Sequence, residues 1–471
     1  MIDFLHLESY RENNRIEAKK SLGGFPQSFW ETYSAFANTL GGIILLGVEE
    51  HRDHSLHAVN LPDPDKLLKE LWDTLNNPAK VSVNILSGKH VAVETVDGKR
   101  IIVITVPRAK RYDKPVYIGG NPLGGTYRRC GEGDYRCTVE EIEAMQRDAS
   151  VRTRDMRVLD SFALDALDFG SVKSYRERMK ACRPGHVWEN LSDEDFLSNI
   201  GAIGRGENGK LHPTAAGLLM FGRHPEILKE YPNYSITYIE ISGEKHLENC
   251  GWRGNISDFF GFANEKLSQN IVVPLGAANG KVIDVAPVVG ALREALANCL
   301  LNADYYGKRG IEIINDNGSY TFSNPGSFRI DAANARSGGV SDPRNGALSR
   351  MFNLIDVGAG IGSGLPQIYA LWERQGWLTP SISESFNPDR ITLTLAIGKG
   401  GARPTARART SLSAQKALII DYLTDHACGS LAELCRLLNA PRKQTEEILS
   451  ALIASDVIAR DKDAPTYRLK R

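Results

Sequence analysis

The sequence predicts a multidomain α/β protein, and three observations lead to this fold class. The chain has 471 residues, whereas one domain usually has about 100–200, so about three or four units are expected. Apolar residues make up 42% and charged residues 24% of the chain, which is typical of a folded globular protein. Segments with helical spacing and segments typical of strands both occur. We expect units at 1–150, 151–245, 246–397 and 411–471, with a linker at 398–410.

Composition and charge exclude several classes of protein. Acidic and basic residues balance at 57 each, so the bulk charge indicates no partner. The seven cysteines form no Cys-x-x-Cys pair, which argues against a disulfide framework or a zinc site and fits a reducing cytosol. The N-terminus soon becomes charged, as a secretory signal does not. No apolar run approaches the ~20 residues that cross a bilayer. We therefore expect a cytoplasmic protein that does not enter a membrane.

The first unit is expected to be mixed α/β. Aromatic residues at helical spacing predict a helix at 25–39, and Gly41 with Gly42 ends it. Strands are predicted at 43–50 and 99–107. A helix at 138–148 closes the unit, because Thr138 and Glu141 have capping-box spacing.

The middle of the chain is expected to combine a helical connector with a second α/β unit. Residues 191–203 and 213–222 predict helices, and 234–243 predicts a strand. Beyond them we expect a helix at 288–304, strands at 311–316 and 319–324, a glycine-rich loop leading into a helix within 358–376, and a strand at 390–397.

The C-terminal unit has the pattern of a winged helix. Helices are predicted at 416–425, 430–438 and 444–455, followed by a short hairpin at 457–469. Arg442 and Lys443 precede the third helix, where a recognition helix meets a nucleic-acid groove. Winged helices also dock onto proteins, so nucleic-acid binding and protein docking both stay open here.

One segment of the first unit is strongly basic. Residues 99–129 contain eight Lys or Arg and one acid. This local excess predicts a surface that faces phosphates, with a merely solvated face as the alternative. The candidate nucleic-acid-binding residues are Arg108, Lys110, Arg111, Lys114, Arg128 and Arg129.

A small group of carboxylates lies near the N-terminus. Glu17 and Lys19 share one face if their segment is a strand, and Glu12 and Glu50 could come close to them. Clustered carboxylates bind Mg²⁺ or Mn²⁺, which can activate water for phosphodiester cleavage. Glu12, Glu17 and Glu50 are therefore candidate metal ligands, and these acids with Lys19 are candidate catalytic residues. Charged strand ends that are simply solvated are the alternative.

The motifs ESYRENNRIEAK, SAFANTLGGIILLGVEE and KPVYI…TYRRCG together resemble the Schlafen AlbA-type domain over residues 1–148. Nucleolytic members cut tRNA or rRNA with an acidic triad, which falls here on Glu12, Glu17 with Lys19, and Glu50, where the family has an aspartate. Other members are described as DNA-binding or regulatory proteins. The resemblance therefore implies nucleic-acid binding, with a metal-dependent endoribonuclease as the alternative.

A second constellation points to a nucleotide pocket. Glu294, Asn298 and Asn302 lie four residues apart, near one face of a predicted helix. An acid and an amide four residues apart can hold a water and a Mg²⁺ against a triphosphate. Glycines before a helix let backbone N–H groups and the helix N-terminus bind phosphate. The remaining candidates are Asn324, Gly326, Gly358, Gly360, Gly362, Ser363 and Gly364.

This second pattern resembles the GHKL superfamily of gyrase, chaperone and histidine-kinase ATPases, which share the Bergerat fold, over about residues 290–397. The resemblance implies that Glu294 is the general base, that Asn298 binds Mg²⁺ and that Asn324 stands at the adenine-reading position. Gly362, Ser363 and Gly364 match the phosphate lid. The loop has no evident catalytic lysine and the chain no phospho-acceptor histidine motif, so slow ATPase activity or ATP sensing is expected.

Together these motifs predict a regulatory or defence-type protein in which ATP, bound with Mg²⁺, controls nucleic-acid engagement. ATP would bias dimerisation or domain arrangement by shifting a population of existing states. A transcription factor with an ATP sensor is a further possibility, and the sequence leaves DNA and RNA open as partners.

Overall fold

The computed structural model describes residues 4–242, 246–269, 271, 284–316, 318–358, 362–386 and 389–398, and parts of the C-terminal region at 419, 423, 429–438, 442–454, 458–460 and 466–469. The chain divides into two compact units, Met1–Lys399 and Gly400–Arg471. The α/β multidomain class is confirmed by helices and several separate sheets. Among the described residues, no helix is both long and apolar enough to span a membrane.

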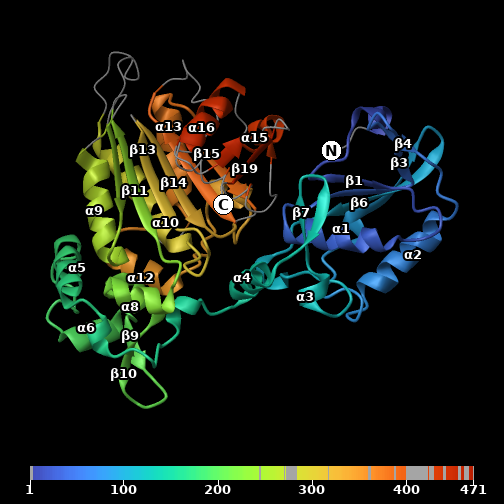
Figure 1. Ribbon diagram of the computed structural model, residues 1–471. Coiled ribbons are helices and arrows are strands. Elements are labelled where there is room, and N and C mark those ends of the chain that lie inside the picture. Colours follow the sequence, from blue (N-terminus) through green and yellow to red (C-terminus); the bar gives the residue numbers. More distant parts are fainter. Residues whose placement is uncertain are drawn as a thin grey trace. The chain divides into compact units, whose positions relative to one another are not determined.

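The N-terminal part of the first unit is built on a four-stranded sheet (Figure 1). Its order is β1 (Ile16–Lys19), β2 (Gly42–Leu46), β6 (Lys99–Val106), β5 (Val91–Val96). Only the β1–β2 pair is parallel. Ile44 and Ile104 share one core with α1 (Gln27–Asn38) and α2 (Pro64–Leu75). Leu45 and Val103 belong to a second core on the opposite face, as the two-residue period of strands requires.

The single strand predicted at 43–50 is wrong, because two strands form there. Gly47 has φ +79°, a left-handed conformation that breaks the extended chain. β3 (Val48–Glu50) therefore leaves the sheet and pairs with β4 (Leu56–Ala58). The predicted end of the first helix is confirmed, since Gly41 has φ +75° directly after α1.

A hairpin and a helix complete this part. β7 (Tyr127–Cys130) pairs with β8 (Gly133–Arg136), after the short helix α3 (Pro122–Gly125). The predicted helix at 138–148 is confirmed as α4 (Val139–Ala149), including its capping box between Thr138 and Glu141. Short 3-10 helices lie at Phe4–Ser9, Gly88–His90, Arg111–Asp113, Arg154–Met156 and Leu164–Ala166.

Residues 169–230 are mainly helical, as expected, and also contain a hairpin. The hairpin joins β9 (Ile203–Arg205) and β10 (Leu211–Pro213). The two predicted helices are confirmed in shorter form as α6 and α7. The helices are α5 (Phe169–Cys182), α6 (Asp193–Asn199), α7 (Ala215–Phe221) and α8 (His224–Glu230).

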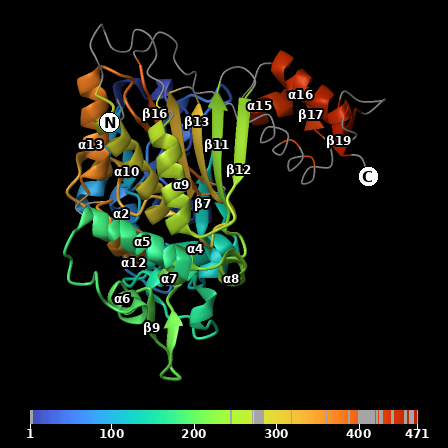
Figure 2. The same cartoon turned by 90° about the vertical axis from the view of Figure 1, so that its left-hand side faces the viewer.

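A six-stranded sheet carries the rest of the first unit. Its order is β12 (His246–Gly251), β11 (Ile236–Ser242), β13 (Ile311–Asp316), β14 (Ser319–Pro325), β16 (Arg390–Ala396), β15 (Ser381–Ser385). Only β11 and β13 run parallel. Figure 2 shows α13 (Gly364–Gln375), α10 (Ala286–Asn302) and α9 (Ile256–Gln269) side by side on one face of this sheet. The predicted helices and strands at 288–304, 311–316, 319–324 and 390–397 are confirmed, whereas β12, β15 and α9 were not foreseen.

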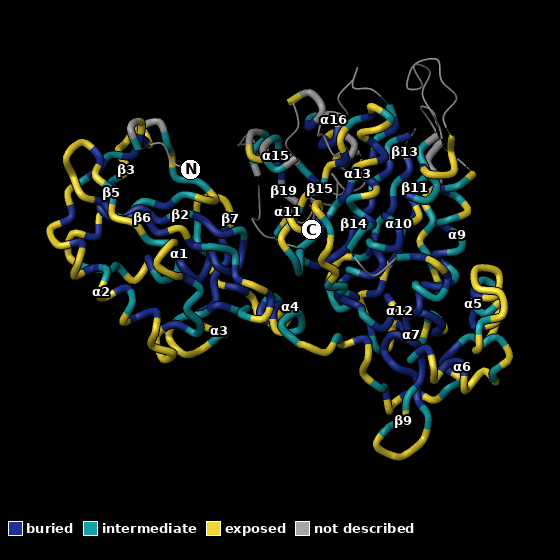
Figure 3. The backbone as a smooth tube through the Cα atoms, turned by 180° about the vertical axis from the view of Figure 1, so that it is seen from behind, coloured by how far each residue is buried: buried dark blue, intermediate teal, exposed yellow. Residues whose placement is uncertain are grey.

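Helix α10 lies between its two neighbours in the main core. Figure 3 shows it largely buried, and Leu292, Leu296 and Leu300 are fully buried there. Two further helices, α11 (Ala332–Ser337) and α12 (Gly346–Leu354), follow β14. The central position of α10 makes it a rigid base for any side chain on its remaining face.

The described residues of the second unit form two helices and a small sheet. α15 (Leu431–Leu438) and α16 (Arg442–Ala454) match two predicted helices. β18 (Ile458–Arg460) and β19 (Thr466–Leu469) form the predicted hairpin, to which β17 (Gly429–Ser430) adds a third strand. The predicted helix at 416–425 lies outside the described residues except for Ile419 and Leu423, as does the predicted linker beyond Gly398. The winged-helix assignment stays a prediction.

Candidate functional site

Helix α10 presents a polar stripe on an otherwise apolar helix. Glu294, Asn298 and Asn302 are half-buried. Apart from Asn298, every residue from Ala295 to Leu301 is buried. Their four-residue spacing places them above one another on one face. All three line a cavity of about 150 Å³.

The opposite walls of this cavity come from the sheet and from the start of α13. Asn324 at the end of β14 lines it, as do Gly358, Gly362, Ser363 and Gly364. The structure thus brings together polar residues that lie up to 70 positions apart, from Glu294 to Gly364. Helix N-termini attract anions, and α13 begins here.

Glu294 faces the glycine-rich loop directly. Its Oε2 accepts a hydrogen bond from the Gly358 backbone N–H at 3.2 Å. A Cβ added at Gly364 would lie 2.3 Å from Glu294 Oε1, so a larger residue at this position would displace the Glu294 side chain. Burial raises the pKa of Glu294, although the Gly358 hydrogen bond opposes that rise. The Glu294 carboxylate therefore accepts the hydrogen bond of the Gly358 N–H, a loop group that could otherwise donate to a phosphate oxygen.

Asn324 is 4% exposed and leaves one of its polar atoms to the cavity. Its Nδ2 donates to the Asn302 carbonyl at 3.3 Å and to the Pro325 carbonyl at 3.2 Å. Because the amide nitrogen is used twice within the chain, the amide oxygen is the atom that can accept from a ligand.

Two predicted cofactor residues lie elsewhere. Gly326 lines a second, larger cavity, where a Cβ would lie 2.2 Å from Arg344 Nη1, and it is not among the residues that line the 150 Å³ cavity. Gly360 lies outside the described residues.

The structure also shows pocket residues that the sequence did not reveal. Phe328, Arg329 and Asp342 line the 150 Å³ cavity, yet no motif marks them. A neighbouring hollow of about 830 Å³ shares Glu294, Gly358 and Gly364 with it. Arginines 183, 293 and 374 line this hollow, so cations surround the far side of the glycine-rich loop.

The N-terminal carboxylates are held by cations of the chain itself. Glu17 lies 2.5 Å from Lys19 Nζ, which confirms that the two share one face, and 2.7 Å from Arg129 Nη2. Glu12 Oε1 accepts from the Ala18 N–H at 2.9 Å. Burial raises the pKa of Glu12, and the charges of Glu17 and Glu50 add to this rise.

This arrangement departs from the predicted metal site. Glu50 pairs with His54 at 3.0 Å, while Glu17 is already paired with two cations. Among the residues that the structure describes, no group of three or more His, Cys, Asp or Glu could hold a metal ion. Lys19 and Arg129 neutralise the Glu17 carboxylate, and a metal site at these carboxylates stays a prediction.

Most of the predicted basic residues surround the second, larger cavity. This cavity measures about 1020 Å³, and Arg108, Lys110, Arg111, Lys114 and Arg128 line it. Its other walls come from α4, from the chain after β14 and from Asp389. The residues therefore lie in a hollow within the first unit, and the expected open basic surface does not form.

Carboxylates from distant parts of the chain pair with these arginines. Both Glu384 oxygens accept from Arg108, at 2.5 and 2.9 Å. Both Asp389 oxygens accept from Arg128, each at 2.6 Å. In the same way Arg111 pairs with Asp342, and Arg129 pairs with Glu17 and Asp134.

Two lysines differ from these arginines. Lys114 Nζ donates to the Asn38 carbonyl at 2.7 Å and, among the described residues, forms no ion pair. Burial, together with the charges of Arg108 and Arg128, lowers the pKa of Lys114 to about 7. Lys110 is exposed at the rim.

In the second unit, the two predicted contact residues begin α16. Arg442 is exposed and lies 2.9 Å from Glu446 one turn later. Lys443 follows it on the helix. Nothing in this geometry distinguishes nucleic-acid binding from protein docking.

Comparisons with known proteins bear on the N-terminal part. Residues 12–138 match the family described as Schlafen, AlbA_2, and residues 143–237 match a domain of unknown function, DUF8451. The crystal structure of the DIP2311 protein from Corynebacterium diphtheriae is 18% identical and covers 97% of this chain and 80% of its own, with a TM-score of 0.40.

A second solved structure matches a shorter region. The N-terminal domain of a putative ATP-dependent DNA helicase RecG-related protein from Nitrosomonas europaea is 33% identical, and the match covers 26% of this chain and 82% of that one, with a TM-score of 0.20. No curated protein matches the chain. The motifs at 8–19, 34–50 and 114–131 and the family match at 12–138 agree, so the N-terminal part of the chain is similar to the Schlafen, AlbA_2 family.

Proposed function

We propose that this protein binds nucleic acid through its AlbA_2 domain and binds ATP with Mg²⁺ in the 150 Å³ cavity, so that the nucleotide controls nucleic-acid engagement. One observation carries the nucleotide part. Glu294, Asn298, Asn302 and Asn324 meet the glycines at the start of α13 around one cavity.

Each group has a chemical task in this proposal. The Asn324 oxygen accepts from the adenine amino group, and Asn298 provides a hard oxygen ligand for Mg²⁺. Backbone N–H groups of the glycine-rich loop and the N-terminus of α13 bind phosphate oxygens. Glu294 orients a water, but its raised pKa and the absence of a lysine from residues 356–365 favour slow hydrolysis.

Support for nucleic acid as the partner comes from the N-terminal part. The Schlafen, AlbA_2 match covers residues 12–138, and a solved structure that is 33% identical over 26% of this chain comes from a protein described as related to a DNA helicase. The planar guanidinium group of arginine presents paired donors that can bind two oxygens of one phosphate. A homodimer and a transcriptional role stay predictions.

Titration of the purified full-length chain with a fluorescent ATP analogue and Mg²⁺ tests the nucleotide part. We expect saturable binding that Asn298→Ala weakens at least about tenfold, since losing an interaction with a charged group costs roughly 1.5–3 kcal/mol. Asn324→Ala should weaken it by a smaller factor, since a neutral hydrogen bond contributes about 0.5–1.5 kcal/mol. Asn199→Ala is the matched control, because Asn199 lies on α6 and lines neither cavity. Equal binding by all four proteins would refute the assignment.

A further inference from the structure

The two cavities share a wall. Residues 327–330 and 340–342 line both the 150 Å³ cavity and the 1020 Å³ cavity. This wall (residues 327–343) connects β14 to Arg344 and contains the short helix α11. Whatever moves the wall on one side therefore changes the other side.

The wall holds the arginine side chains of the larger cavity. The Phe328 N–H donates to Glu384 Oε1 at 2.8 Å, and the Phe328 carbonyl accepts from Arg108 Nη2 at 2.9 Å. The Phe328 backbone is thus hydrogen-bonded to both members of the Arg108–Glu384 pair. At the other end of the wall, both oxygens of Asp342 accept from Arg111.

The smaller cavity must widen to hold a nucleotide. Its volume is about 150 Å³, whereas pockets for small molecules usually measure roughly 300–1,000 Å³. The lining residues on α10, β14 and β16 belong to elements of the packed core, which resists deformation. The wall also lines the cavity, and in it Gly338 and Gly339 have positive φ and one short helix is the only regular element among the described residues. The wall is therefore the side that can yield.

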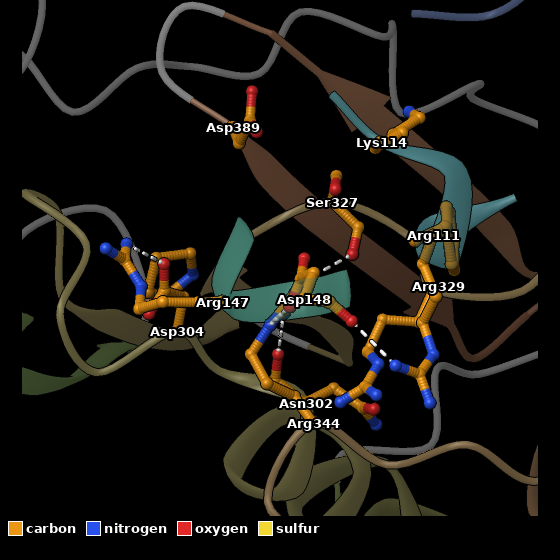
Figure 4. Close-up of polar contacts among 12 residues, drawn as sticks. Arg111, Lys114, Arg147, Asp148, Asn302, Asp304, Ser327, Arg329, Arg344 and Asp389 are labelled. Atoms are coloured by element: carbon orange, nitrogen blue, oxygen red, sulfur yellow. Dashed lines mark hydrogen bonds and ion pairs between the residues drawn. The ribbon is translucent and has the colours of Figure 1, made fainter. Parts of the chain in front are cut away.

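The larger cavity is lined by basic side chains, as a phosphate-binding site is. The anions that pair with its arginines are carboxylates of the chain itself. Figure 4 shows Arg344 beside Asp148, with Arg111, Arg329 and Lys114 on the right-hand side of the view. Asp342 forms ion pairs with two arginines, Arg111 and Arg329. Arg329 Nη2 lies 3.2 Å from Asp342 Oδ1, but the angle between them does not allow a hydrogen bond. Within the described part of the chain, Lys114 donates to a backbone carbonyl and pairs with no carboxylate. Carboxylates that bind arginine in this paired geometry stand where phosphate oxygens would.

We propose that the 1020 Å³ cavity is a phosphodiester-binding site for a nucleic-acid strand, closed here by Glu384 and Asp342, and opened when a nucleotide displaces the wall. This rests on the proposed function. The nucleotide's base pushes residues 327–343 away from α10, so that Arg108 and Arg111 lose their carboxylates and accept phosphates. Linkage requires the reverse effect as well: bound nucleic acid tightens nucleotide binding by the same factor.

Fluorescence anisotropy with labelled single-stranded RNA and DNA tests this site, using full-length protein with and without Mg²⁺ and a non-hydrolysable ATP analogue at constant salt. We expect the analogue to tighten wild-type binding by about 5- to 150-fold. Asp342→Asn and Glu384→Gln should bind tightly without the analogue and respond to it less. Asp193→Asn is the matched control, because it also removes one carboxylate paired with an arginine but lines neither cavity.

The outcomes separate this inference from the proposed function. Calorimetry on the same samples reports nucleotide binding by itself, and circular dichroism reports folding. Nucleotide binding with unchanged nucleic-acid affinity in the wild type overturns both this inference and the nucleotide control stated in the proposed function. A wild-type response to the analogue, together with wild-type affinity and response in whichever of Asp342→Asn and Glu384→Gln folds, overturns the inference alone. Absence of nucleotide binding overturns the proposed function. RNA or DNA preference follows from comparing the two strands.

Discussion

Arg344→Leu tests the contacts that join α4 to the chain around the larger cavity. Arg344 Nε and Nη2 donate to the two Asp148 oxygens at 2.8 and 2.6 Å, and its other bonds reach the Asn302 and Ser327 carbonyls (Figure 4). Both side chains are well buried, at 9% and 18% exposure. Removing one partner of a buried pair leaves an uncompensated charge.

The expected loss is therefore large. Breaking a buried pair costs about 3–5 kcal/mol, and in a unit of this size each kcal/mol lowers Tm by roughly 2 °C. Arg344→Leu should lower Tm by about 6–10 °C at neutral pH. Arg100→Leu is the control, because its pair with Asp65 is exposed and should change the free energy of unfolding by less than about 1 kcal/mol.

The pH dependence identifies Asp148 as the cause. Burial alone would raise the pKa of Asp148, but Arg344, with help from Arg329 and Arg147, holds it below its ordinary value of 3.8. A lowered carboxyl pKa contributes stability above the ordinary value, which is lost as the pH falls through the folded-state pKa. The variant lacks this contribution, so differential scanning calorimetry should show the Tm difference shrink in acid. A difference that is independent of pH, or no larger than that of Arg100→Leu, would refute the reasoning.

Three further predictions concern other parts of the chain. Thr138→Ala should cost about 1 kcal/mol in chemical unfolding, because it removes the side-chain cap of α4; an unchanged midpoint would contradict this. Wild-type affinity for ATP should fall as the pH rises through the raised pKa of Glu294, because a new negative charge then faces the phosphates. Titrations of Glu294→Gln should show a flat profile, and parallel profiles would exclude this role. Mn²⁺ should leave the wild-type Tm unchanged, and tRNA incubated with Mn²⁺ should stay intact with wild type and Glu17→Ala alike, since Lys19 and Arg129 already hold Glu17. Cleavage by wild type but not by Glu17→Ala would favour the ribonuclease alternative.

Local features of the fold could be predicted because their causes are local. The cap of α4 needs only Thr138 and Glu141, which lie three residues apart. The end of α1 needs only a residue that accepts a positive φ, and Gly41 provides it. The stripe of Glu294, Asn298 and Asn302 follows from the helical repeat, so its common face was visible in the sequence.

The state of the basic residues could not be predicted, since their partners are distant in sequence. Arg128 and Asp389 are separated by 261 positions, and Arg108 and Glu384 by 276. The local excess of positive charge at 99–129 therefore gave no sign that acids from β15 and the β15–β16 turn would cover it. The break at Gly47 was missed for a related reason, because the pairing of β3 with β4 decides it.

Photolabelling with 8-azido-ATP tests the central claim most directly, because the azide reports where the adenine lies. After irradiation of the full-length chain with Mg²⁺ and digestion, the label should appear on peptides that contain Asn324 or the adjoining wall at residues 327–330, and excess ATP should prevent it. Label confined to other regions, or no label that ATP can displace, would contradict a nucleotide site between α10 and the glycine-rich loop.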